Sequence, residues 1–157
     1  MSYDFNRVWL AKKFEEIRKR ILAALEQLND DQVNWSPDGR SHSISTLIKH
    51  IDGNIQERIL KGMLHQNIQR NRDDELKQTF IRKSELSQLV QHRFELIILT
   101  VTSMTDEALE QKQLVRTRER TSLDMLHQCA AHYSEHMGQI FYIAKQILQE
   151  QYKSTSI

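Results

Sequence analysis

The residues best suited to chemistry in this sequence are two histidines four positions apart and a third one far upstream. His132 and His136 lie in an apolar stretch with helical periodicity, and residues four apart stand on one face of a helix, roughly 6 Å from each other. Both imidazoles could therefore reach the same cation. His50, in another helical segment rich in Ile and Leu, could complete a set of three nitrogen ligands. Such a set would hold a first-row divalent metal and leave coordination positions free for water or substrate.

Helical angles separate these histidines from the others in the chain. At about 100° per residue, His132 and His136 fall within the apolar stripe of their helix, whereas His127 falls on the opposite side. His50 lies roughly 120° from the centre of its own apolar face, on the flank that it shares with Asn54. The angles alone therefore do not predict that His50 turns toward the pair. The remaining histidines are expected to be exposed or away from any site: His42, His65 and His92.

Other interpretations of the same residues stay open. A histidine on an apolar helical face is more often a hydrogen-bonded core residue than a metal ligand, although two buried imidazoles without a carboxylate one turn away are hard to satisfy. The stretch from His132 to His136 also fits the H-x-x-E-H pattern of inverted zinc proteases, but the only later acid is Glu150. Cys129 could approach a metal or act as a nucleophile, yet a small buried hydrophobic role suits it better.

Length, charge and cysteine content exclude several classes of protein. The 157 residues fit one domain of ordinary size, residues 1–157. Twenty-two basic and 21 acidic side chains are scattered along the chain, which argues against a binder of nucleic acid or of an anionic membrane. No apolar run is long enough to span a bilayer. A single cysteine excludes an internal disulfide framework, and the first residues lack the features of a signal peptide. We therefore expect a cytoplasmic protein.

The composition and periodicity predict an all-α fold. Glycine occurs four times and proline once, and apolar residues recur at steps of three and four. These steps predict four helices, at about 4–28, 43–64, 84–104 and 121–150, with a long polar connection over 65–83 between the second and the third. This arrangement is typical of a four-helix bundle with one crossover. Ser41 or Ser43 is available to cap the second helix and Ser84 the third, and the fourth helix is expected to begin near Thr121 or Ser122.

Three segments of the chain carry a family resemblance: Asn34-Trp35-Ser36-Pro37, the stretch from Ser43 to Asn54, and His132-Tyr133-Ser134-Glu135-His136-Met137-Gly138-Gln139-Ile140. Together they resemble the DinB/YfiT-like metal-binding superfamily, and within it the small bacterial DinB-like proteins. The resemblance covers nearly the whole chain, and its specific part is one histidine on the second helix combined with H-x-x-x-H-x-G-Q-I on the last. It implies a four-helix bundle in which His50, His132 and His136 bind a divalent metal, with nickel or zinc expected before manganese or iron.

The resemblance also implies a choice of functions. Several members of the superfamily are thiol S-transferases that use bacillithiol or similar low-molecular-weight thiols, and others have been described as hydrolases. We therefore expect a divalent-metal-dependent enzyme, with thiol transfer to an electrophile preferred and hydrolysis second. The alternatives are a non-catalytic metal-binding module for stress response or interaction and, third, a purely structural bundle without metal. The substrate, the metal and the thiol are not fixed by the sequence, and no residue can be assigned as general base.

Polar residues near the expected ligands are candidates for further contacts. Asn54 and Gln139, each one turn or less from a ligand, are predicted to contact the cofactor or substrate or to support the ligands. The acidic stretch over 71–75 is interpreted as a solvated loop. The expected partners are a small-molecule substrate or thiol and, because of the apolar helix faces, a second copy of the chain in a homodimer. Weaker candidates for site residues are Asp52, Glu57, Arg58 and Arg72.

Overall fold

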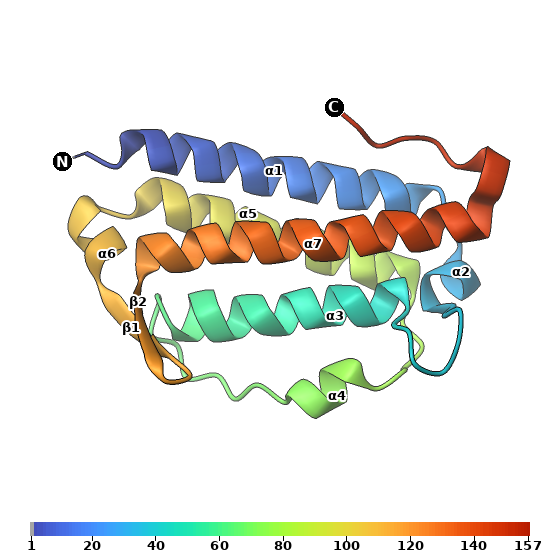
Figure 1. Cartoon of the computed structure of the whole chain (residues 1–157), viewed down its shortest axis with the longest axis horizontal. Helices are drawn as coiled ribbons and strands as arrows, with labels where there is room; N and C mark the ends of the chain where they lie inside the picture. The colour runs from blue at the N-terminus through green and yellow to red at the C-terminus, as the bar shows by residue number, and fades with distance from the viewer. Residues whose placement is uncertain (1) are drawn as a thin grey trace.

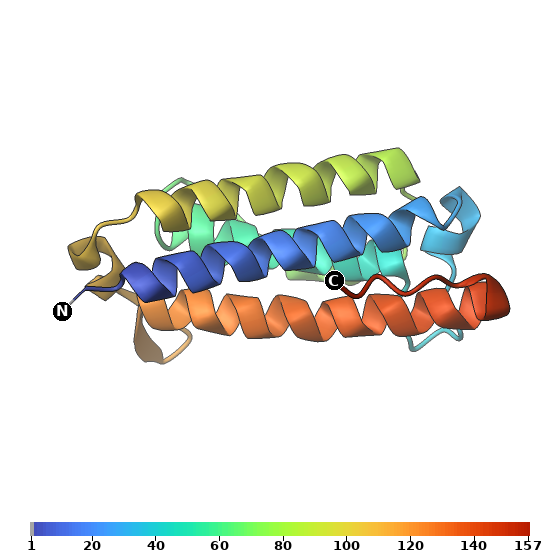
Figure 2. The ribbon, with the colours of Figure 1, turned by 90° about the horizontal axis from the view of Figure 1, so that it is seen from above.

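Four long helices run side by side in the computed structural model, which describes residues 2–157 (Figure 1). They are α1 (Asp4–Glu26), α3 (Ile44–Ile55), α5 (Lys83–Ser103) and α7 (Ser122–Leu148), and α3 continues as the π-helix η1 (Gln56–Lys61). Both α1 and α3 pack against α5 and α7, so the order around the bundle is α1, α5, α3, α7, as the two views show (Figure 2). The predicted all-α four-helix bundle is confirmed.

The long helices associate because each carries an apolar stripe at steps of three and four residues. In α1 this stripe includes Phe14, which is fully buried, and in α5 it includes Phe94. Both rings pack against Tyr133 of α7, with ring centroids 6.3 and 5.9 Å from that of Tyr133. Fully burying a side chain of this kind stabilises the fold by roughly 1.5–3 kcal/mol. The centre of the bundle is therefore an aromatic cluster that joins α1, α5 and α7.

The connection between η1 and α5 crosses the outside of the bundle along α3. It carries the short helix α4 (Arg72–Leu76), which packs against α3 (Figure 1). The side chain of Lys49 in α3 donates a hydrogen bond to the carbonyl oxygen of Lys77 at 2.8 Å, and this contact holds the end of α4 in place. The crossover predicted between the second and third long helices is confirmed, and it brings a polar segment next to the middle of α3.

A β-hairpin, which the sequence pattern did not predict, precedes α7. Strands β1 (Lys112–Val115) and β2 (Arg118–Thr121) pair in antiparallel fashion after the short helix α6 (Asp106–Glu110). Each strand is only four residues long, and neither shows the clear alternation of apolar and polar residues that identifies a strand in a sequence. The hairpin lies at the same end of the bundle as η1 (Figure 1), and the Gln113 side chain donates to the carbonyl oxygen of Arg58 at 3.3 Å.

Three of the long helices begin with identifiable caps, and one of these differs from the prediction. Ser43 caps α3 and Thr121 caps α7, and each side chain accepts a hydrogen bond from the backbone N–H of the third residue of its helix. The prediction that Ser84 caps the third long helix is wrong, because α5 already begins at Lys83. The backbone N–H of Lys83 donates instead to Oδ1 of Asp30 at 2.8 Å. Asp30 belongs to the short helix α2 (Asp30–Asn34), so this cap is supplied by a residue far away in the sequence.

The chain ends beside the first helix. After α7 it turns through the 3-10 helix η2 (Gln149–Gln151) and runs back along α1 (Figure 2). The side-chain amide of Gln27 exchanges two hydrogen bonds with the backbone of Lys153, at 3.0 and 2.8 Å. Within residues 2–157, no helix combines the length and the apolar character that crossing a bilayer requires.

Candidate metal site

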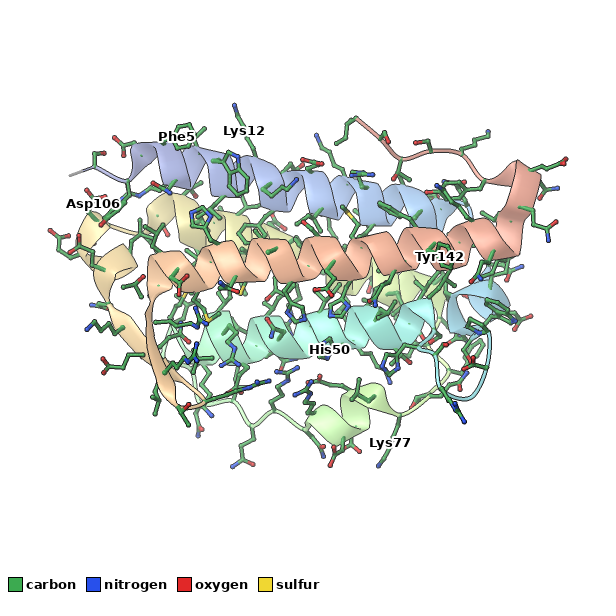
Figure 3. The ribbon with its side chains drawn as sticks, in the orientation of Figure 1. Phe5, Lys12, His50, Lys77, Asp106 and Tyr142 are labelled. Carbon is green, nitrogen blue, oxygen red and sulfur yellow. The ribbon has the colours of Figure 1, made fainter. Side chains whose placement is uncertain are left out.

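Three histidines meet between α3 and α7. Each of His50, His132 and His136 offers one ring nitrogen, and these three nitrogens lie within 4.8 Å of one another. The ring centroid of His50 is 5.5 Å from that of His132 and 4.9 Å from that of His136. His50 lies on α3, the helix placed between α7 and α4 (Figure 3). The structure therefore brings together the three residues that the sequence singled out, and it resolves the direction of His50 that helical angles left open.

The two histidines of α7 face each other through their Nε2 atoms, which are 2.8 Å apart. The Nδ1 atom of His136 lies 2.7 Å from Oε1 of Gln139. Because an amide oxygen can only accept, Nδ1 of His136 is the donor in this contact, and Nε2 is the ring nitrogen that faces His132. Two Nε2 atoms at this distance are satisfied by a shared proton or by a shared cation. Gln139 thus acts on the site by fixing the tautomer of His136.

The ring of His50 has a neighbour that was not predicted from the sequence, the carboxylate of Glu75 in α4. Nδ1 of His50 is buried and forms no hydrogen bond within residues 2–157, although Oε2 of Glu75 lies 3.5 Å away. Arg70 holds both carboxylate oxygens of Glu75, at 2.7 and 2.9 Å. This carboxylate packs on α3 at Gly53, where an added Cβ would lie 1.7 Å from Oε1. The interpretation of 71–75 as a solvated loop is therefore wrong for Glu75, whose side chain is largely covered.

The lowered pKa values of His50 and His132 suit the histidine cluster to bind a cation through neutral ring nitrogens. Burial, with the nearby charges of His136 and Arg70, lowers the pKa of His50 to about 4. Burial, followed by the charge of His136, also lowers the pKa of His132. Both rings are therefore neutral at neutral pH and keep a lone pair for a ligand bond. For the same reason, the 3.5 Å approach of Glu75 to His50 is a contact with a neutral ring and not an ion pair.

Asn54 lies one turn beyond His50, and its oxygen is already engaged in the core. Oδ1 of Asn54 accepts a hydrogen bond from the hydroxyl of Tyr133 at 2.8 Å. The residue also lines a pocket of about 470 Å³ that reaches His132. Gln139 lines a different pocket, of about 670 Å³, on the other side of the site. Contact of Asn54 or Gln139 with a cofactor or substrate stays a prediction, and the structure places the two in separate pockets.

Cys129 is a small buried residue of the core, as the sequence favoured, and not a nucleophile or a metal ligand. Its side chain is 1% exposed, and burial raises the pKa of the thiol to about 11. The thiol is therefore protonated at neutral pH and is neither a nucleophile nor a good metal ligand. Its sulfur lies 3.9 Å from Oδ1 of Asn54, inside the packed interior.

The remaining histidines lie away from the cluster. His127 stacks on Trp9 of α1, with ring centroids 5.6 Å apart, and the other three histidines are exposed, as expected. Asp52 forms an ion pair with Arg93 that joins α3 to α5. Arg58 lines the 470 Å³ pocket. Among residues 2–157 no acidic side chain joins the three histidines, which argues against the inverted zinc protease.

Two signals in the sequence point to the features that were not predicted, the packing of Glu75 on α3 and the β-hairpin. Gly53 lies three residues after His50 inside a helix, and such a glycine can mark a position where another group approaches closely. The arginines at 116, 118 and 120 alternate with other residues directly before the last helix, which is the period of a strand. Both signals are short, and neither predicts which distant residues are in contact with Gly53 or with the arginines.

The comparisons with known proteins agree with this architecture. Two solved structures share the fold: a DinB-like protein, YjoA, from Bacillus subtilis and a conserved protein from Enterococcus faecalis. The first is 19% identical, covers 94% of this chain and 97% of its own, and has a TM-score of 0.69. The second is 14% identical, covers 89% of this chain and 95% of its own, and has a TM-score of 0.72. The fold is therefore DinB-like, as the resemblance implied.

The sequence itself matches a family over almost its full length. No curated protein is similar enough in sequence to count as a match. Residues 4–157 match a family that is described as "Protein of unknown function (DUF1572)". The matched segment includes all four long helices, the crossover and the three clustered histidines. This chain therefore belongs to the DUF1572 family.

Proposed function

We propose that this protein is a divalent-metal-dependent enzyme that transfers a low-molecular-weight thiol to an electrophile. His50, His132 and His136 are its metal ligands in this proposal. The observation that carries it is the convergence of their ring nitrogens, from two helices, to within 4.8 Å. In the part of the chain that the structure describes, no fourth histidine, cysteine or carboxylate joins them. A metal bound by only three residues keeps positions open for a substrate, as working sites do.

The donor set narrows the choice of metal. Three imidazole nitrogens suit zinc, nickel or iron, whereas manganese prefers oxygen ligands. We therefore propose zinc or nickel, with iron next and manganese last. The residues present fit such an ion: His50 and His132 are neutral at neutral pH because of their lowered pKa, and Gln139 holds His136 in one tautomer. The Glu75 carboxylate next to His50 is the kind of outer support that metal-binding histidines commonly have.

The thiol in this reaction has to come from outside the protein. A divalent ion in this site would lower the pKa of a coordinated thiol, so that the nucleophilic thiolate is available at neutral pH. The chain has one cysteine, Cys129, and its thiol is buried with a pKa raised to about 11. The resemblance to a superfamily that includes thiol S-transferases supports the same choice.

Hydrolysis is less well supported by the residues around the site. Activating a water molecule calls for a base that accepts its proton. Glu75 lies beside His50, but both of its carboxylate oxygens accept hydrogen bonds from Arg70. The carboxylate is thus already engaged with the guanidinium of Arg70 and is not directed at a water molecule in the site. A thiol is far more acidic than water, so it can release its proton to the solvent on binding and needs no protein base when its sulfur attacks the electrophile.

The metal site is tested by elemental analysis of protein purified without a metal-affinity tag. We expect about one divalent ion per chain in the native protein, and its loss when His50, His132 or His136 is replaced by Ala. The matched control is His127→Ala, on the same helix as the pair but stacked on Trp9 outside the cluster. It should keep the full metal content. Metal content that survives each of the three replacements would sink the proposed site.

The reaction is tested separately on metal-loaded protein. Bacillithiol and a panel of electrophiles are supplied, and both the loss of free thiol and the appearance of the conjugate are followed. We expect turnover that disappears after treatment with a chelator and returns with the metal. A full metal complement without turnover over a broad panel would instead identify a non-catalytic metal-binding module.

A further inference from the structure

A pocket with concentrated positive charge opens next to the histidine cluster. It has a volume of about 470 Å³ and lies between η1, the β-hairpin and α7, with His132 in its wall. Four arginines line it: Arg58 from η1, and Arg116, Arg118 and Arg120 from the hairpin. No acidic residue among positions 2–157 lines it, although the whole chain has 22 basic and 21 acidic residues. The charge is thus gathered at this place in an otherwise balanced protein.

The hairpin presents its arginines to the pocket because of its register. Side chains alternate between the two faces of a strand, so Arg118 and Arg120 share one face, and Glu119 points to the other. Gln113, the register partner of Arg120, lies on the same face and donates to the carbonyl oxygen of Arg58 at 3.3 Å. This hydrogen bond fixes the arginine-bearing face toward η1. The pairing of the two strands therefore places Arg118 and Arg120 in the pocket wall.

Most of this charge is not neutralised by the protein. Arg120 forms an ion pair with Asp124 in the first turn of α7, at 2.7 Å. Within residues 2–157, Arg58, Arg116 and Arg118 form no salt bridge with an acidic side chain. Guanidinium groups gathered in a concave site attract anions, and their planar donors match the oxygens of carboxylate and phosphate groups.

Arg116 occupies a backbone conformation that suits glycine. It is the first of two turn residues between the paired Val115 and Arg118, and its φ is 58°. For a residue with a side chain, this left-handed conformation is strained by roughly 1–2 kcal/mol. A glycine would form the same turn without strain. The strained turn therefore carries a charged side chain that the hairpin does not need in order to fold.

We propose that this pocket binds a carboxylate or phosphate group of the small molecule that reacts at the histidines. The proposal rests on the function proposed above and specifies its substrate as an anion. His132 belongs both to the pocket wall and to the histidine cluster, so a molecule held by its anionic group in the pocket has its other end at the cluster. Asn54 and Gln128 also line the pocket. Oδ1 of Asn54 is already held by Tyr133, so the exposed Gln128 side chain is the polar group available to the uncharged part of the molecule.

The test is a titration of isotope-labelled protein with succinate and with phenyl phosphate, followed by NMR. Succinamide and benzyl alcohol serve as the uncharged counterparts. We expect shifts in the hairpin and the arginine side chains with at least one of the two anions and with neither counterpart. Salt should weaken the binding. Comparing succinate with phenyl phosphate tells whether the pocket prefers a carboxylate or a phosphate.

The decisive variant is Arg116→Gly, which removes the charge and keeps a residue that suits the turn. We expect its dissociation constant for the preferred anion to rise by about tenfold or more. Lys112→Gln is the matched control, because it removes one charge from the same hairpin outside the pocket wall. Its affinity should not change. Binding of neither anion, or equal affinities of Arg116→Gly and the native protein, would overturn the proposal.

The titration separates this proposal from the one on which it rests. It is carried out on metal-free protein as well as on metal-loaded protein, and anion binding is expected in both. If the elemental analysis finds no metal but the anion still binds, the proposed metal chemistry fails and the anion pocket stands. If the metal is present but no anion binds, the pocket fails and the metal site stands.

Discussion

The hydroxyl of Tyr133 donates a hydrogen bond to Oδ1 of Asn54 at 2.8 Å, and this contact joins α7 to α3 beside the histidines. Tyr133 directly follows His132, and Asn54 lies one turn beyond His50. Both partners are buried. A hydrogen bond in such a setting has a preferred geometry, so it fixes how the two helices face each other. It therefore supports the placement of His50 opposite the pair on α7.

Replacing Tyr133 with Phe should lower the stability of the protein. The variant keeps the ring but leaves Oδ1 of Asn54 without this partner in the core. We expect the free energy of unfolding to fall by about 1–3 kcal/mol, measured by urea denaturation. Tyr142→Phe is the control, because Tyr142 is 66% exposed, and it should change stability by less than about 0.5 kcal/mol. Equal stability of both variants would show that the Asn54 contact does not contribute.

The pairing of His132 with His136 could be predicted from the residues themselves, whereas the direction of His50 could not. The pairing of His132 and His136 follows from their spacing on one helix, which is a local property. His50 depends on the flank that α3 turns toward α7, and hydrophobic periodicity does not report polar contacts between helices. The Asn54 side chain lies on that flank and bonds to Tyr133. The family resemblance supplied the convergence that the helical angles alone could not predict.

The polar segments were the least predictable part of the fold. Glu75 lies in a polar stretch, and its packing against Gly53 and its ion pair with Arg70 are both set by the crossover along α3. The strands of the β-hairpin that carries the arginines are too short and too polar to show an apolar alternation. In both segments the structure depends on contacts with distant residues. Helix positions were predictable because their apolar stripes report burial locally.

The start of α5 gives a direct test of such a distant contact. Asp30 accepts a hydrogen bond from the backbone N–H of Lys83 at 2.8 Å, whereas Ser84, the cap predicted from the sequence, is exposed. Replacing Asp30 with Ala should lower the free energy of unfolding by about 0.5–2 kcal/mol, the usual effect of losing a helix cap. Ser84→Ala should leave it nearly unchanged. The reverse order in thermal or urea denaturation would restore Ser84 as the cap.

The stability of the metal-free protein should fall as the pH is lowered. In the folded chain the pKa of His50 is about 4, below its ordinary value of 6.5, and the pKa of His132 is shifted the same way. Between these values the unfolded chain binds protons that the folded chain does not. This contribution to stability is therefore complete above about pH 6.5 and is lost as the pH falls toward about 4.

The pH dependence is measured by urea denaturation in the presence of a chelator, from about pH 7 to about pH 5. Other groups also titrate in this range, so the informative comparison is with His50→Gln, which lacks the titrating ring. The variant should lose less stability than the native protein over the same interval. Equal losses would mean that His50 does not keep its low pKa in the folded chain.

Replacing either of two glycines close to the site, Gly53 and Gly138, tests whether Glu75 contributes to metal binding. A Cβ at Gly53 would lie 1.7 Å from Oε1 of Glu75, whereas a Cβ at Gly138 would meet nothing within 4 Å. Each replacement by Ala favours its helix by up to about 1 kcal/mol, so both variants should fold. Only Gly53→Ala has to push the carboxylate away from His50, and its metal affinity should fall by about 10- to 100-fold. Competition with a chelating indicator measures this, and equal affinities would mean that Glu75 does not support His50.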